Sequence, residues 1–131
     1  MKISELSIGD WVRYDRGTDA VQIMGIYVRN NQECVVMSDS YFPDGVIGFV
    51  ECIKPIPLTS EILEKNGLCV VEEDADFSEY ELFGSENFSI FHAKGTLHYR
   101  LETPQASVVC WNVHQLQHAL RLAGVEKEIK V

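Results

Sequence analysis

The stretch from residue 111 to residue 125 constrains the fold most, because it predicts one complete helix with both of its ends defined. Asn112 is a favourable N-cap residue, since its side-chain oxygen can accept a hydrogen bond from the first helical turn. Gln115, three positions later, completes a capping box. Gly124 can adopt the left-handed conformation that commonly ends a helix. The sequence therefore predicts a C-terminal helix.

The side chains of this predicted helix divide into two faces at about 100° per residue. The apolar face consists of Val113, Leu116, Ala119, Leu120 and Ala123. The opposite face contains His114, His118 and Arg121, and Leu122 fits the apolar face poorly. Folding does not explain these last four residues, so we expect them to face outward, as a surface offered to a partner.

His114 and His118 have the i, i+4 spacing of a helical metal-binding pair. A zinc-peptidase motif would need glutamate at position 115 as the general base, but the chain has Gln115 there. No third ligand is signalled by the spacing of the other histidines and cysteines. We expect no metal and no cofactor. A metal-dependent enzyme that uses His114 and His118 stays open as an alternative.

The balance of charge limits the classes of partner. The chain has 131 residues, 20 of them acidic and 11 basic, so its formal net charge is −9. An acidic field repels phosphate backbones, and the chain has no run of lysine and arginine. A nucleic-acid partner is therefore disfavoured, although a small barrel that binds nucleic acid remains an alternative.

Cysteine usage and hydropathy indicate a cytoplasmic protein. The four cysteines are scattered, lie in apolar runs and form no C-x-x-C pair, as is typical of reduced, buried thiols. The first residues contain no long apolar region, so we expect no signal peptide. No apolar run approaches the roughly 20 residues that span a membrane.

Residues 1–56 predict a lobe of short β-strands. The expected strands cover residues 11–14, 21–28, 33–37 and 46–53. Gly25 in the middle of the second strand indicates a bulge or bend, and Asn30-Asn31 predicts a tight hairpin turn. Gly9-Asp10-Trp11-Val12 is similar to the opening of SH3-like barrels. We therefore expect an SH3-like lobe or a bent antiparallel sheet.

Five aromatic residues of this lobe are candidates for a recognition surface. They are Trp11, Tyr14, Tyr27, Tyr41 and Phe42. Small barrels use such side chains to bind peptides or single-stranded nucleic acids. The alternative is that they belong to the core and to loop tips. Because residues 1–56 contain five Lys or Arg and eight Asp or Glu, a net charge of −3, we expect a protein ligand rather than a nucleic acid.

Residues 57–131 predict a second lobe that contains both helices. Thr59 and Gly67 bound a short helix within residues 58–68, which we expect to connect the lobes. Alternating apolar residues before the C-terminal helix predict a second antiparallel sheet. The fold class is therefore α+β, with lobes at 1–56 and 57–131 that could also form one continuous domain.

The segment from residue 72 to residue 86 is strongly acidic. Its acids are Glu72, Glu73, Asp74, Asp76, Glu79, Glu81 and Glu86. The calcium-loop pattern of ligands does not fit this spacing. We expect a solvated acidic loop, with docking of a basic partner as the alternative.

Two motifs carry a resemblance to other proteins. Ile56-Pro57-Leu58-Thr59 with Glu61-Ile62-Leu63 and Asn66-Gly67, and later Val113-His114-Gln115-Leu116-Gln117, resemble a group of small uncharacterised proteins of Bacteroides-type bacteria and their prophages. The resemblance implies a bacterial, cytoplasmic setting and a mobile-element origin. It implies no activity and assigns no functional residue.

No motif of nucleophilic catalysis or nucleotide binding occurs in the chain. We therefore expect a non-enzymatic accessory protein that acts through contact with another protein. Its partner is unidentified, and its oligomeric state is open. The expected interaction surface combines Trp11, Tyr14, Tyr41 and Phe42 with His114, His118, Arg121 and Leu122.

Overall fold

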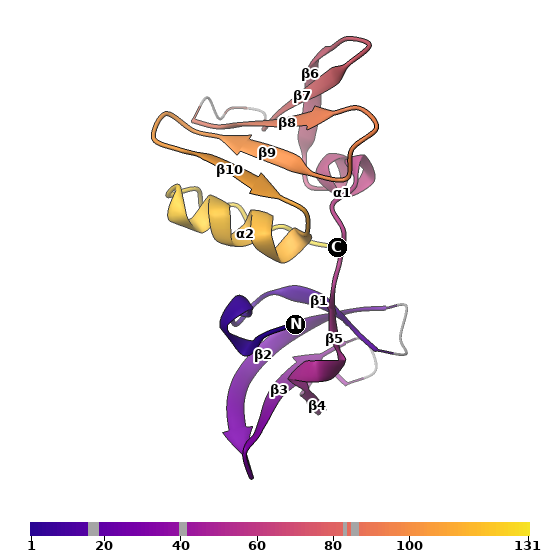
Figure 1. The fold of residues 1–131 in the computed structure, drawn as a ribbon, viewed down its shortest axis with the longest axis vertical. Helices are drawn as coiled ribbons and strands as arrows, with labels where there is room; N and C mark the ends of the chain where they lie inside the picture. Colours follow the sequence, from indigo (N-terminus) through magenta and orange to yellow (C-terminus); the bar gives the residue numbers. More distant parts are fainter. Residues whose placement is uncertain (16–18, 40–41, 83, 85–86) are drawn as a thin grey trace. The chain divides into compact units, whose positions relative to one another are not determined.

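The computed structural model describes the 131-residue chain except for residues 16–18, 40–41, 83 and 85–86. The chain divides into two compact units, Met1–Ile56 and Pro57–Val131, and each is described by itself. The described residues form two five-stranded antiparallel sheets and two α-helices (Figure 1). The predicted α+β class is confirmed.

The first unit is a bent antiparallel sheet. Its elements are η1 (Ile3–Glu5), β1 (Trp11–Tyr14), β2 (Ala20–Arg29), β3 (Gln32–Ser38), β4 (Val46–Phe49), η2 (Val50–Cys52) and β5 (Ile53–Pro55). The strand order is β4-β3-β2-β1-β5, which leaves β4 and β5 as the edges among the described residues. A buried cluster on this sheet includes Val12, Ile23, Val35 and Ile53.

Two local predictions for this unit are confirmed, and one is wrong. The register of β2 and β3 shifts between Ile23 and Gly25, as a bulge requires, and Asn30 and Asn31 both have positive φ. The expected single strand over residues 46–53 is instead divided by the 3-10 turn of η2. Val50 in that turn is buried, and the turn redirects the chain so that β5 can pair with β1.

The second unit is a five-stranded meander with two helices. Its elements are α1 (Ser60–Lys65), β6 (Leu68–Glu73), β7 (Phe77–Leu82), β8 (Ser89–Ala93), β9 (Tyr99–Glu102), β10 (Ser107–Cys110) and α2 (Val113–Leu122). The strand order is β10-β9-β8-β7-β6, so β10 and β6 are the edge strands. Helix α1 contacts β6, and α2 lies beside β10 (Figure 1).

The predicted helix ends are confirmed. The Thr59 hydroxyl accepts a hydrogen bond from the Ile62 N–H at 3.2 Å. The Gln115 side-chain oxygen accepts from the Trp111 and Asn112 N–H groups at 2.7 and 3.2 Å. Both helices are therefore bounded by the local interactions that the sequence indicates.

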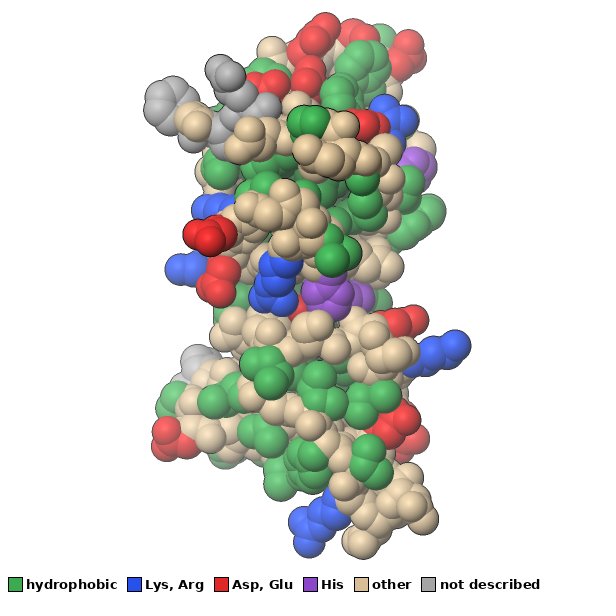
Figure 2. All heavy atoms as spheres, turned by 90° about the vertical axis from the view of Figure 1, so that its left-hand side faces the viewer, with side chains coloured by type: hydrophobic (Ala, Val, Ile, Leu, Met, Phe, Trp, Pro, Cys, Tyr) green, Lys and Arg blue, Asp and Glu red, His purple; other side chains and the backbone are tan. Residues whose placement is uncertain are grey.

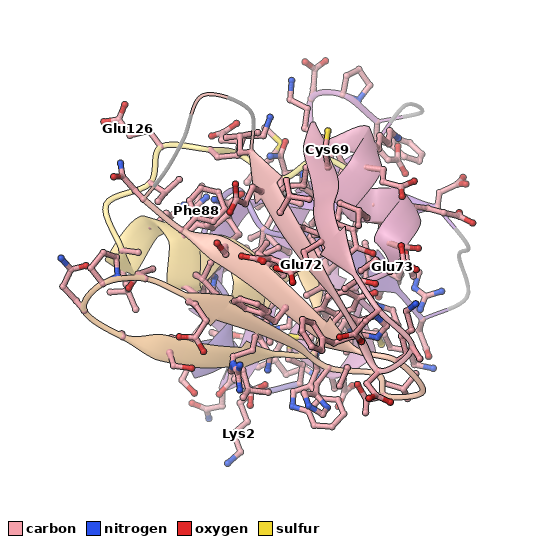
Figure 3. The ribbon with its side chains drawn as sticks, turned by 90° about the horizontal axis from the view of Figure 1, so that it is seen from above. Lys2, Cys69, Glu72, Glu73, Phe88 and Glu126 are labelled. Atoms are coloured by element: carbon pink, nitrogen blue, oxygen red, sulfur yellow. The ribbon has the colours of Figure 1, made fainter. Side chains whose placement is uncertain are left out.

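The predicted acidic loop is wrong, because most of its described acids lie in β6 and β7. A register shift between Val70 and Glu72 marks a bulge, and Glu72 pairs with Glu79 across the hairpin. Figure 2 shows Asp and Glu side chains gathered over the end of this hairpin. Figure 3 shows Cys69, Glu72 and Glu73 along β6. The acids of β6 and of the turn are exposed, whereas Glu79 and Glu81 on β7 are half-buried. Glu86 lies outside the described residues.

The C-terminal segment is held by two side-chain amides. Gln117 donates to the Lys127 carbonyl at 3.0 Å and accepts from the Ile129 N–H at 2.7 Å. Asn66 donates to the Lys130 carbonyl and accepts from the Lys130 N–H, both at 2.7 Å. Ile129 is buried between these contacts. The segment is therefore fixed to the unit although it forms no helix or strand.

Candidate functional site

His114 is buried, with 4% of its surface exposed, so the prediction that it faces outward is wrong. Helix α2 is covered on more sides than its apolar stripe indicates. Gln117, one turn from His114, is also buried, because it holds the C-terminal segment. The sequence offered no signal that this segment packs against the helix.

His118 is half-buried, and its ring contacts the His114 ring edge-on with 5.8 Å between centroids. Among the described residues, no group of three or more His, Cys, Asp or Glu side chains is arranged to hold a metal ion. Within the described residues, the structure therefore shows no third ligand that would join His114 and His118 in a metal site.

The N-terminal aromatic residues do not form one surface. Trp11 and Tyr14 are half-buried on β1, and their odd spacing directs them to opposite faces of the strand. Burial is the main reason that the pKa of Tyr14 is raised. Phe42 is exposed, and Tyr41 lies outside the described residues. The first unit thus offers no described cluster that combines these side chains.

A groove lies between α2 and the β9–β10 hairpin, with a volume of about 670 Å³. Its helical wall is a single stripe of Gln115, His118, Ala119 and Leu122, spaced one turn apart. Its opposite wall, on the β9–β10 hairpin, consists of Leu101, Thr103, Gln105, Ala106, Val108 and Val109. The groove brings together two of the predicted surface residues, His118 and Leu122, and leaves Arg121 exposed beside them.

The tip of the groove is exposed and apolar. Leu122 has 91% of its surface exposed, although it lines a wall made mostly of apolar side chains. Val108 and Val109, which also line the groove, are exposed apolar residues too, so Leu122 belongs to an exposed apolar patch of the kind that marks a contact surface. We therefore take Leu122 as the side chain that most clearly marks this groove as unfilled.

The turn of the β9–β10 hairpin fixes which backbone groups of β10 face outward. The Thr103 N–H donates to the Ala106 carbonyl at 2.9 Å, and the Ala106 N–H donates to the Thr103 hydroxyl at 3.0 Å. Hydrogen-bonded and non-hydrogen-bonded pairs alternate along an antiparallel ladder. Val108 therefore exchanges hydrogen bonds with Leu101, its partner in β9. The N–H and C=O groups of Ser107 and Val109 point to the open edge.

The two edges of the second sheet differ in character. Strand β6 carries Glu72 and Glu73 and contains a bulge, which are features that discourage pairing with another strand. Strand β10 has the sequence Ser-Val-Val-Cys, with no charge, proline or bulge. The β10 edge therefore lacks these three protections over its four residues, and beyond its end the Leu58 N–H donates to the Trp111 carbonyl at 3.1 Å.

The cysteine at the end of β10 is not a candidate nucleophile. Burial raises the pKa of the Cys110 thiol to about 11, so the thiol stays protonated near neutral pH. The four cysteines are free thiols, but the prediction that all are buried is wrong, because Cys69 is exposed. Cys69 lies on the outer face of β6, where no apolar layer covers it.

No family model, curated protein or solved structure matches this chain. In the described residues, no helix has the length and apolar character needed to cross a membrane. The candidate site therefore rests on the geometry of β10 and α2. The sequence signal that could have identified it is the uncharged run before the helix N-cap, together with Leu122 outside the apolar stripe.

Proposed function

We propose that this protein is an interaction module that binds an extended polypeptide segment along the open edge of β10. The segment's alternate side chains would enter the groove between β10 and α2. The observation that carries the proposal is an uncharged edge strand directly beside an unfilled apolar groove. In this view the protein is a non-enzymatic accessory protein, and the resemblance of its two helix motifs favours a bacterial or prophage cytoplasmic setting.

The backbone of β10 supports an extended ligand rather than a helical one. Ser107 and Val109 present donor and acceptor groups in the pattern that a neighbouring strand satisfies. A helix satisfies its own backbone groups and would leave these two residues unpaired. Side chains alternate along a strand, so every second residue of the ligand would face α2.

Selection from displayed random peptides of about 12 residues tests the function directly, with the full chain as bait. We expect selected peptides with alternating apolar residues that retain binding as free synthetic peptides. Failure to select any such peptide, or selection of peptides whose binding does not involve β10, would contradict the proposal.

Two variants locate the binding site. Leu122→Asp is expected to lower the affinity for the selected peptides about 10-fold or more. The reason is that it replaces an apolar contact worth roughly 1.5–3 kcal/mol with a charge. The matched control is Leu97→Asp, since Leu97 is exposed but does not line the groove. Fluorescence anisotropy with labelled peptide measures both affinities, and equal loss in the two variants would place the site elsewhere.

A further inference from the structure

We infer that the strand received at the β10 edge is β10 of a second copy of this chain. This inference rests on the proposed function and names its partner. The two copies would pair antiparallel about a two-fold axis, so that two five-stranded sheets become one continuous sheet. The resulting interface is isologous, because the same edge is used by both partners.

The alternation of backbone groups makes β10 complementary to itself. With the two-fold axis at Val108, Ser107 of one copy lies opposite Val109 of the other, and the reverse. Both members of each such pair direct their backbone groups to the edge, so each pair exchanges two hydrogen bonds, about four in all. Val108 lies opposite its own copy in a non-hydrogen-bonded pair. A shift of one residue would place edge-facing groups opposite groups that already bind β9.

The side chains around this edge favour self-association. Val108, Val109, Trp111 and Leu122 are all exposed apolar residues on or beside β10. An antiparallel pair brings Val108 against its own copy, and it extends the groove of each unit towards the partner. No charged residue lies within β10, so the copies meet without like-charge repulsion at the strand itself.

The acidic surface lies at the opposite edge of the same sheet. Residues 57–131 contain 12 Asp or Glu and six Lys or Arg, a net charge of −6. The described acids of segment 72–81 lie on β6, β7 and the turn between them. Nine strand spacings of about 4.8 Å would separate the two β6 edges, roughly 40 Å in all. Salt screens charges over about 10 Å at 0.1 M, so the acidic edges would not oppose the pairing.

Cysteine cross-linking tests the register. We would place Val108→Cys in a Cys69→Ser background, which removes the exposed thiol, and supply oxidised glutathione as the oxidant. The non-hydrogen-bonded pair would bring the two Cα atoms to about 4.5 Å, within the range of a disulfide. Ser107→Cys in the same background is the matched control, because residues 107 of the two copies would lie roughly 8 Å apart, too far for a bridge. Disulfide-linked dimer is expected only with the Val108→Cys variant.

Sedimentation equilibrium tests the association in solution. We expect concentration-dependent dimerisation of the wild-type chain, and at least a 10-fold weaker dimer for Val109→Pro, which removes an edge-facing N–H. Val109→Lys serves as a second variant should the proline variant fail to fold. Ile47→Lys, at an exposed apolar site on edge strand β4, is the control that should leave the dimer unchanged.

The possible outcomes separate the two proposals. A wild-type chain that stays monomeric at about 200 µM, where weak interfaces of small area are populated, overturns the inference. So does a dimer that Val109→Pro and Val109→Lys leave intact, or one that cross-links equally at positions 107 and 108. In each of these cases, peptides selected at the β10 edge would still support the proposed function. The absence of such peptides together with a β10-dependent dimer would restrict the edge to self-association.

Discussion

Two buried amides, Asn66 and Gln117, stabilise the second unit by binding main-chain groups of the C-terminal segment. Each amide satisfies one carbonyl and one N–H of that segment. A buried polar group that is left without a partner costs free energy, so these two side chains stabilise the fold by satisfying main-chain groups as well as by packing. Both residues lie in the two motifs of the resemblance, but those motifs assign them no role, and their main-chain partners lie 64 and 10 to 12 residues away along the chain, so these contacts could not be predicted from sequence.

Gln117→Leu is expected to lower the free energy of unfolding by about 2–3 kcal/mol, because it leaves the Ile129 N–H and the Lys127 carbonyl without their partner. Urea unfolding measures the loss. Gln105→Leu, in the exposed β9–β10 turn, is the control and should change stability by less than about 0.5 kcal/mol. A Gln117→Leu protein as stable as the control would show that the amide contacts contribute little.

Two buried side chains that ionise at high pH, Cys110 and Tyr99, predict a loss of stability there. Burial raises the pKa of Cys110 from 9.0 to about 11 and that of Tyr99 from 10.0 to about 12. Folding therefore favours their protonated forms, and this contribution is complete below pH 9 and falls as the pH rises towards 12. Urea titrations between pH 8 and pH 11 should show stability declining above pH 9. Cys110→Ala should reduce the decline between pH 9 and pH 11, and an identical curve would contradict the assignment.

At the level of elements, the helices were predictable and the strands only partly so. Caps act within one turn, so Thr59 and Gln115 indicate helix ends without knowledge of the tertiary fold. Strand pairing is not local. The acidic residues Glu72 and Glu79 suggest a loop, because the sequence does not reveal that they pair with each other across a hairpin. The turn at η2 was missed for a similar reason, since its apolar residues continue the strand pattern of β4.

Proline substitutions in β10 test the direction of its backbone groups. Val108→Pro removes an N–H that pairs with Leu101, so we expect it to lower the free energy of unfolding by about 2 kcal/mol or more. Val109→Pro removes only an edge-facing N–H, which edge strands tolerate, so we expect a change of less than about 1 kcal/mol. The reverse order in urea unfolding would mean that Ser107 and Val109 face β9 instead.

For the whole molecule, the α+β class followed from the order of strand and helix signals, whereas the candidate site did not. The groove depends on β10 being an edge strand, which only the complete strand order reveals. It also depends on the β9–β10 turn, which fixes the register of the hairpin and so places Val108 across the groove from the α2 residues that line it. The sequence identified Leu122 as unexplained by folding, but it contained no information about the wall across from it.

The net charge of −9 predicts how salt affects the inferred dimer. Two copies with the same sign of net charge repel each other where their charges come within the screening length of the solution, and the β10 strand contains no ion pairs to be screened. We therefore expect the dimer Kd to decrease modestly as NaCl rises from about 50 mM to about 500 mM, because the repulsion is screened. Sedimentation at both concentrations measures this. A dimer that weakens with salt would indicate an ionic interface elsewhere on the chain.

The amide contacts to the C-terminal segment also determine which substitutions that segment can accept. Asn66 and Gln117 bind main-chain atoms of the segment, so these contacts place no requirement on the side chains of Lys127 and Lys130. Ile129 is the exception, since its side chain is buried. A library randomised over residues 126–130 and sorted for folded protein should therefore retain varied residues at most positions and an apolar residue at 129. The segment could diverge widely among descendants of this sequence while keeping its path along the fold.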